Sequence, residues 1–264
     1  MPRLVTLPAA SERAGPLPSA NPAARSAEGS PVSDPVAAEL ALLAQADTPV
    51  AALWQTGPSL IVPRSYRRHA GYEAARARFA AEGWPVHERP SGGALVPQGP
   101  GVLNLSLAWP VPGAPGPWIE PIYLHLCRLL QVPLQALGIA THWQAVPGSF
   151  CDGRFNLACG AGAHARKIAG TAQYWRPRPA GATGPAGHTV LAHALLLVDP
   201  DLDLLHQRAN AFEQAVGSGQ HYEPSRTVSV AQMLEPQAPP DWANQLRQRL
   251  AHTVSRTPLP ARAG

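Results

Sequence analysis

Residues 102–110, VLNLSLAWP, restrict the fold of this chain more than any other segment. Leucine occupies every second position from 103 to 107, and Asn104, Ser106 and Ala108 alternate with it. A period of two is typical of a β-strand that buries one face and leaves the other less covered. The chain is therefore expected to build a sheet with a core on one side of this strand.

Further strands and helices are predicted on both sides of this segment. Short apolar or β-branched runs predict strands over residues 58–64, 84–90, 154–159, 167–174 and 188–198. Helical spacing of apolar residues predicts helices over residues 34–46, 66–82, 118–138, 200–217, 227–234 and 240–252. Asp34 followed by Pro35 is typical of a helix N-terminus. The mixed order of strands and helices favours an α+β fold over strict βαβ alternation.

Length and composition predict one catalytic-size domain. The chain has 264 residues, of which 45% are hydrophobic, and this is enough for one substantial core. Residues 1–33 are rich in Pro, Ala and Ser and are expected to form a disordered tail, although their arginines faintly resemble an organellar transit peptide. The domain is expected to span residues 34–255, with a flexible C-terminus at 256–264.

Several classes of protein are disfavoured by charge and hydropathy. The net charge is only +4 and the arginines are scattered, so no nucleic-acid partner is expected. No apolar run approaches the roughly 20 residues of a membrane span, and no signal peptide is visible, so we expect a cytoplasmic protein without a membrane partner. No metal site is expected, because His188 and His193 would point to opposite faces of one strand and the other histidines are isolated.

The three cysteines differ in their surroundings. An odd number without paired spacing argues against a disulfide framework. Cys127 lies on the apolar stripe of a predicted helix, and Cys159 is in register with apolar residues of a predicted strand, so both are expected in the core. Cys151 lies between VPGSF and DGR, in turn chemistry with no apolar period. It is therefore either an incidental small residue or an exposed, reactive thiol.

Lys167 is the only lysine among 21 basic residues. A bias towards GC-rich codons would make lysine scarce without any functional cause, and a lone lysine is often a solvated charge. An ammonium beside a cysteine, however, lowers the pKa of the thiol and can donate to a carbonyl oxygen during attack. A planar guanidinium is a poor substitute in that role.

A second candidate stretch, ERPSGGALVPQGPGVLNLSL, covers residues 88–107. Its adjacent Gly92 and Gly93 allow the backbone to approach a ligand closely, although an ordinary hairpin turn would look similar. The stretch lacks the lysine of a phosphate-binding P-loop, and it does not open a helix as a dinucleotide fingerprint does.

The two stretches together resemble a known family. RPSGGALV and GVLNLSL, followed by SFCDGRFNL and RKIAGTAQ, are similar to the lipoate and octanoate attachment family, which shares its fold with biotin protein ligases. The likeness is closest to octanoyl-transferases that carry the acyl group on a cysteine, and it covers about residues 58–215. It implies a mixed, mostly antiparallel sheet flanked by helices, with an apolar tunnel for an eight-carbon chain.

The resemblance also implies roles for individual residues. Cys151 would be the nucleophile, and Lys167 would contact the acyl carbonyl. Substrate-binding positions are implied at Arg89, Ser91, Gly92, Gly93, Asn104, Gly170, Thr171, Ala172 and Gln173. The chain departs from the ligase pattern at Ala94, where ligases have a third glycine, and at Gln98, where they usually carry a histidine. The loop between Asn156 and Lys167 is also longer than is usual in the family.

The resemblance implies an acyltransferase that needs no metal or nucleotide. An octanoyl or lipoyl group would pass from an acyl carrier protein or a glycine-cleavage H protein through a Cys151 thioester to a lysine of a lipoyl-domain protein. Two alternatives stay open. One is an ATP-dependent lipoate-protein ligase, which would use ATP and Mg²⁺, and the other is a non-catalytic protein that binds an acyl group or a partner.

Overall fold

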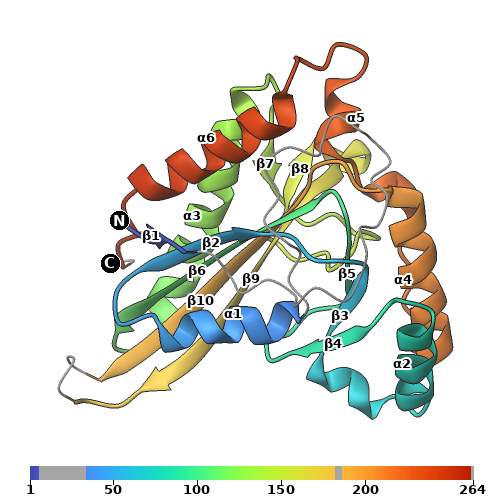
Figure 1. The fold of residues 1–264 in the computed structure, drawn as a ribbon, viewed down its shortest axis with the longest axis horizontal. Helices are drawn as coiled ribbons and strands as arrows, with labels where there is room; N and C mark the ends of the chain where they lie inside the picture. The colour runs from blue at the N-terminus through green and yellow to red at the C-terminus, as the bar shows by residue number, and fades with distance from the viewer. Residues whose placement is uncertain (6–33, 182–185, 263–264) are drawn as a thin grey trace.

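A seven-stranded, mostly antiparallel sheet runs through the molecule (Figure 1). The computed structural model describes residues 1–5, 34–181 and 186–262. Among the described strands of this large sheet, only β1 and β2 pair in parallel. In spatial order the strands are β1 (Arg3–Leu4), β2 (Val50–Trp54), β6 (Val102–Pro112), β10 (Gly187–Leu197), β9 (Arg166–Arg178), β8 (Leu157–Cys159) and β7 (His142–Trp143).

Both faces of this sheet are covered by helices. Apolar residues of α3 (Gly116–Gln135), α5 (Val230–Leu234) and α6 (Trp242–Arg256) pack on one face, together with the leucines at alternate positions of β6. Leu42 of α1 (Pro35–Ala44) packs on the other face with Ala108 and Leu191. The α+β fold with flanking helices is therefore confirmed. The expected half-covered β6 is wrong, because Asn104 and Ser106 are fully buried: Asn104 pairs with Gln98 of β5, and Ser106 donates to Glu39 of α1.

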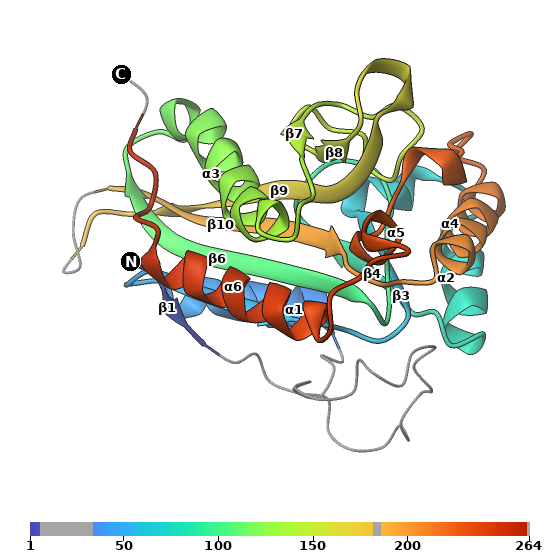
Figure 2. The ribbon, with the colours of Figure 1, turned by 90° about the horizontal axis from the view of Figure 1, so that it is seen from above.

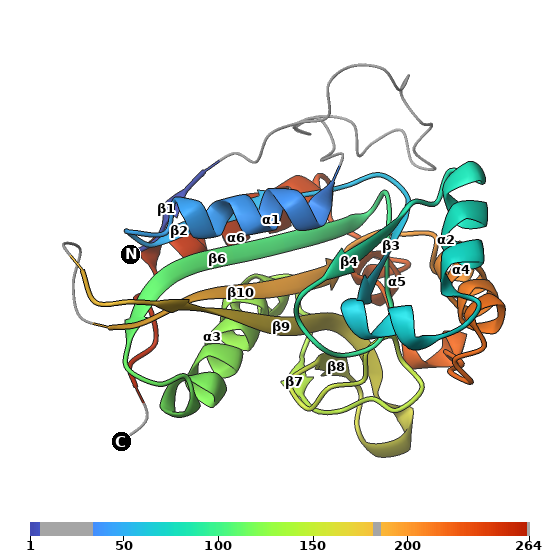
Figure 3. The same cartoon turned by 90° about the horizontal axis from the view of Figure 1, so that it is seen from below.

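A smaller three-stranded sheet lies at the end of the molecule opposite the tip of the β9–β10 hairpin (Figure 3). Its order is β4 (Val86–Arg89), β3 (Ser59–Pro63) and β5 (Val96–Gln98). Helices α2 (Tyr72–Ala81) and α4 (Leu202–Val216) pack against it around Phe212. Strands β7 and β8 extend the large sheet towards this same end (Figure 2). The loop that joins β7 to β8 therefore lies against the loop that joins β4 to β5.

Local signals mark the starts of α1, α4 and α5 and the end of α4. The Asp34 side chain accepts a hydrogen bond from the backbone of Ala37 at 3.0 Å, which is the N-cap that the sequence predicts. Helix α4 begins after the N-cap Asp201 and ends at Gly217, whose φ is 71°. Ser229 and Gln232 form a capping box at α5. Two single-turn 3₁₀ segments occupy Gly162–His164 and Pro224–Arg226.

The predicted helix over 66–82 is in fact two elements. A 3₁₀ turn, Arg64–Arg68, is followed by a break at residues 69–71 and then by α2. At Gly71 a Cβ atom would lie 2.5 Å from the carbonyl oxygen of Ala215. Gly71, the N-cap of α2, therefore lets α4 approach closely at a break that the apolar spacing does not predict.

The two ends of the chain differ from the expected tails where they are described. Residues Arg3–Leu4 form β1 and pair with β2, whereas residues 6–33 lie outside the described part of the chain. Helix α6 continues to Arg256, and Leu259 packs against the main core. Across the described ranges, none of the helices combines the length and the apolar character needed to cross a membrane.

Candidate active site

Cys151 lies in a tight turn in the loop that joins β7 to β8. Its φ is 48°, a left-handed conformation that a residue with a Cβ rarely adopts and that costs about 1–2 kcal/mol. Its carbonyl oxygen accepts hydrogen bonds from the Gly153 amide at 2.9 Å and from Asn156 Nδ2 at 3.0 Å. These bonds hold the strained turn and present a half-buried thiol.

Lys167 lies at the start of β9, beneath this turn. Its side chain is only 4% exposed, and Nζ donates to the carbonyl oxygens of Phe150 and Cys151, the latter at 3.0 Å. Burial lowers the pKa of Lys167 to about 8, although negative charge on Cys151 and Asp152 opposes this shift. Hydrogen bonds within the described residues use two of its three N–H donors, which leaves one for another acceptor.

Gly93 lies directly against the Cys151 sulfur. A Cβ atom on Gly93 would be 2.7 Å from Cys151 Sγ, and the φ of Gly93 is 102°. Nothing comparable surrounds Gly92, where a Cβ atom would meet no atom within 4 Å. Of the two adjacent glycines, Gly93 is therefore the one whose missing side chain leaves space for the Cys151 sulfur.

The Arg89 guanidinium holds the loop of residues 90–95, which joins β4 to β5 and is called the glycine loop below, through hydrogen bonds to backbone carbonyls. It donates to the carbonyl oxygens of Ile61 at 2.9 Å, Gly92 at 3.0 Å and Ala94 at 2.6 Å. It lies near the site, and its three hydrogen bonds go to one backbone carbonyl of β3 and two of the loop. Arg89 therefore shapes the loop that faces Cys151.

The β9 residues after Lys167 support the site from the sheet. A Cβ atom at Gly170 would lie 3.0 Å from Lys167 Nζ, so this glycine leaves room for the ammonium. Thr171 Oγ1 donates to the Phe155 carbonyl at 2.7 Å. This bond connects β9 to the loop of residues 144–156, which is called the Cys151 loop below. Gln173 Nε2 donates to the Ile119 carbonyl of α3 at 2.8 Å, farther along the strand. Ala172 pairs with His193 in the β9–β10 register.

Asn104 does not join this group. Its side chain is fully buried and exchanges two hydrogen bonds of 3.0 Å with the Gln98 side chain. Gln98 therefore forms a closed amide pair with Asn104. Ser91 is half-buried in the glycine loop.

The cavity beside Cys151 has a volume of about 40 Å³. This is room for a few water molecules, not for an eight-carbon chain. Its lining is mostly polar and includes Ala94, Ser149, Asp152, His221 and Tyr222. The apolar tunnel that the resemblance implies is therefore not open at this cavity.

The other two cysteines are buried, as the sequence predicts. Cys127 is 1% exposed and Cys159 is 2% exposed. Burial raises the pKa of Cys127 to about 12 and that of Cys159 to about 11, so both are neutral thiols near pH 7. Nowhere in the described ranges do three His, Cys, Asp or Glu side chains gather in a group that could hold a metal ion.

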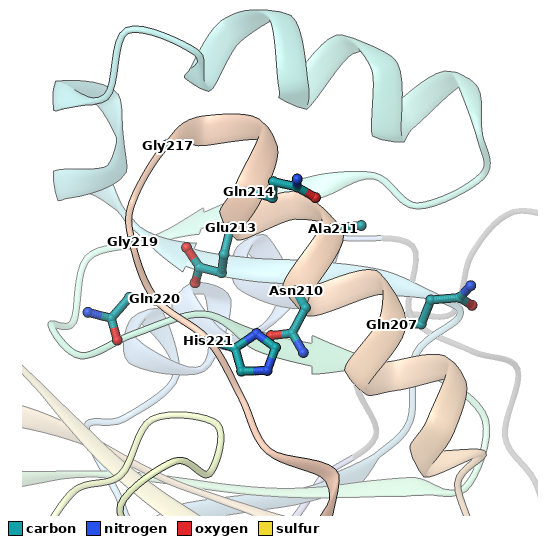
Figure 4. A pocket seen from close by; sticks show the side chains of 9 residues that line it. All are labelled: Gln207, Asn210, Ala211, Glu213, Gln214, Gly217, Gly219, Gln220 and His221. Atoms are coloured by element: carbon teal, nitrogen blue, oxygen red, sulfur yellow. The ribbon is translucent and has the colours of Figure 1, made fainter.

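Sequence reasoning misses the wall of the site that comes from the end of α4. A broad groove of about 790 Å³ lies between α4 and residues 217–221, and it shares Gln220 and His221 with the cavity at Cys151 (Figure 4). Asn156 is also missed, although it lies within the SFCDGRFNL stretch. No local signal marks Glu213, a buried carboxylate behind this groove.

The sequence of this chain is similar to those of known proteins. The family model of the lipoyl protein ligase A/B catalytic domain matches residues 32–251. An uncharacterized protein of Cupriavidus necator is 53% identical over 238 residues, which cover 87% of this chain and 94% of that protein. An octanoyl-[GcvH]:protein N-octanoyltransferase of Kyrpidia tusciae is 35% identical over 173 residues, and the match covers 64% of this chain and 57% of the transferase.

Solved structures show the same fold. A lipoate-protein ligase A bound with ATP has a TM-score of 0.58 at 17% identity, over 82% of this chain and 76% of the ligase chain. A bipartite lipoate protein ligase from Thermoplasma acidophilum, described with its E2 lipoyl domain, has a TM-score of 0.55 at 19% identity, over 82% of this chain and 75% of that one. Because the family model spans most of the sequence, this chain belongs to the family of lipoyl protein ligase A/B catalytic domains.

Proposed function

We propose that this protein transfers an octanoyl or lipoyl group through a Cys151 thioester to a lysine of a lipoyl-domain protein. The observation that carries the proposal is the contact between the Cys151 turn and the buried Lys167 of β9. The thiol rests against Gly93, and the buried ammonium binds the carbonyl of the same cysteine. A nucleophile that lines a small cavity and a buried hydrogen-bond donor bound to the same residue support this assignment.

The first step forms the acyl-enzyme. The Cys151 thiolate attacks the carbonyl carbon of the donor, a C–S bond forms, and the carbonyl electron pair moves to the oxygen. The free N–H of Lys167 stabilises the resulting oxyanion. When the intermediate collapses, the bond to the donor's sulfur or nitrogen breaks, and the leaving thiolate or amine takes up a proton.

The second step passes the group to the acceptor. The ε-amine of the acceptor lysine attacks the Cys151 thioester, an amide bond forms, and the Cys151 thiolate leaves. The proton lost by the amine balances the proton taken up in the first step. The chemistry thus returns the site to its starting state without a nucleotide.

The relatives suggest the partners. The transferase of Kyrpidia tusciae is named for octanoyl-GcvH, and the archaeal ligase is described with an E2 lipoyl domain. We therefore propose an octanoylated or lipoylated glycine-cleavage H protein, or an acyl carrier protein, as the donor. Lipoyl domains of other proteins would be the acceptors.

Intact mass spectrometry tests the proposal directly. The purified protein is incubated with octanoylated H protein or octanoyl-acyl carrier protein in the absence of nucleotide. We expect an octanoyl adduct on Cys151, its absence in Cys151→Ser, and discharge of the adduct by an apo lipoyl domain. Modification of the lipoyl domain only when ATP and Mg²⁺ are added would establish the ligase instead. No adduct and no transfer under either condition would favour a binding protein.

A further inference from the structure

A buried carboxylate lies behind the groove of Figure 4. Glu213 is 0% exposed, and its Oε1 accepts hydrogen bonds from the hydroxyls of Tyr66 at 2.7 Å and Tyr222 at 2.6 Å. Its Oε2 accepts a further bond from Ser218. Burial raises the pKa of both phenols, so their hydroxyls remain donors. Hydrogen bonds to a buried carboxylate are among the stronger ones in proteins.

One branch of this network reaches the glycine loop. The Tyr66 hydroxyl accepts a hydrogen bond of 3.2 Å from the backbone amide of Leu95 while it donates to Glu213. Leu95 follows Ala94, which lines the cavity at Cys151, and Gly93, which lies against the sulfur. The carboxylate therefore fixes one wall of the cavity through a single tyrosine.

The other branch reaches the opposite wall. Tyr222 itself lines the cavity, and its ring lies 5.2 Å from the ring of Phe150, the residue before Cys151. The Asn210 side chain exchanges two hydrogen bonds with the backbone of Tyr222, at 2.9 and 2.8 Å. Next along the chain, the amide of Glu223 donates to the Gly148 carbonyl at 2.8 Å. Glu213 thus ties the segment of residues 218–223 to the Cys151 loop.

From these contacts we infer that Glu213 is a positioning residue for acyl transfer, which holds the two walls of the Cys151 cavity in register through Tyr66 and Tyr222. The inference rests on the proposed function and deepens it. Glu213 touches no reacting atom. It sets how the glycine loop and the segment of residues 218–223 face the thiol, and therefore how an acyl carbonyl is presented to it.

A matched pair of tyrosine variants tests the inference. Tyr66→Phe removes the hydroxyl between Glu213 and Leu95, whereas Tyr72→Phe removes a buried hydroxyl that donates to Glu88 at 2.8 Å. Both rings pack on Phe212 with centroids 6.4 Å apart, so each variant removes one hydroxyl from the same core. Glu213→Gln serves as the conservative variant, because its amide oxygen still accepts from both phenols.

Three readouts separate positioning from general destabilisation. They are the maximal rate of Cys151 octanoylation at saturating donor, the rate of Cys151 alkylation by iodoacetamide, and the melting temperature. Tyr66→Phe should slow octanoylation about tenfold, because the cavity wall shifts, while alkylation by the small reagent stays within about twofold. Tyr72→Phe should stay near the wild-type rate of octanoylation, whereas Glu213→Gln should slow it less than Tyr66→Phe does, because its amide oxygen still accepts from both phenols.

The outcomes distinguish the two proposals. Equal octanoylation rates for Tyr66→Phe and Tyr72→Phe, with a wild type that forms the adduct, would overturn the positioning role alone. Equal losses of octanoylation and alkylation in Tyr66→Phe would also overturn it, because the defect would then lie in the thiol or the fold. A wild type that forms no adduct would overturn the proposed function and this inference together.

Discussion

Replacing Gly93 by alanine should damage the site far more than the same change at its neighbour. The new Cβ atom would lie 2.7 Å from Cys151 Sγ and 3.1 Å from Arg89 Nη2. Atoms of this size pack at about 3.5–4.0 Å, so the sulfur must move by about 1 Å. A displacement of that size at a reacting atom costs about 100-fold in rate.

The backbone adds a second cost. The φ of Gly93 is 102°, a region that residues with a Cβ atom rarely adopt, so the variant should lose about 1–3 kcal/mol of stability. Gly92→Ala is the matched control, because its Cβ atom would meet nothing within 4 Å. Its rate and its melting temperature should both remain near those of the wild type.

The assay measures the rate of octanoyl-adduct formation on Cys151 together with thermal unfolding. Both variants are compared at a temperature at which each is fully folded, so that the loss in rate is not a loss of protein. A Gly93→Ala protein that reacts as fast as Gly92→Ala would refute the reasoning, because the thiol would then not rest against this glycine.

Four further predictions concern the same region and its support. Lys167→Arg should slow acyl transfer by about 100-fold or more in steady-state assays, and a folded variant with a near wild-type rate would show that any cation suffices. Because burial lowers the pKa of Lys167 to about 8, acyl transfer should decline as the pH rises through 8 and the ammonium is lost, whereas iodoacetamide alkylation of Cys151 should not decline. Cys151→Gly should be more stable than Cys151→Ala by about 1 kcal/mol in chemical denaturation, since φ is 48°, and equal midpoints would show that the turn relaxes. Gly71→Ala should lose about 1–3 kcal/mol, because its Cβ atom would lie 2.5 Å from the Ala215 carbonyl oxygen, and an unchanged melting temperature would contradict that close approach.

Local pattern was enough to predict the long strands, most of the helices and the separation of the three cysteines. Cys127 and Cys159 follow an apolar period and are buried, whereas Cys151 lies in turn residues and is half-buried. Strands β2, β5 and β7 were not predicted; runs of two to five residues are recognised only where other signals bound them, as the prolines at 58 and 63 do for β3. The fold class depends on long elements and was therefore accessible from the sequence.

Features set by distant contacts could not be predicted in this way. The sequence shows Gly92 and Gly93 as equivalent, and only the position of the Cys151 sulfur distinguishes them. Tyr66 and Glu213 are 147 positions apart and share a hydrogen bond that no spacing reveals. The burial of both faces of β6 likewise depends on where α1 and β5 lie.

The contrast among the three thiols has a practical consequence for experiments on the native chain. Cys127 and Cys159 are shielded by the core and held in the unreactive thiol form, whereas Cys151 is partly accessible. A maleimide fluorophore or a disulfide-linked spin probe should therefore attach at one position without prior removal of any cysteine. Each molecule would then carry its reporter at the turn between β7 and β8, where the approach of a partner protein could be followed directly.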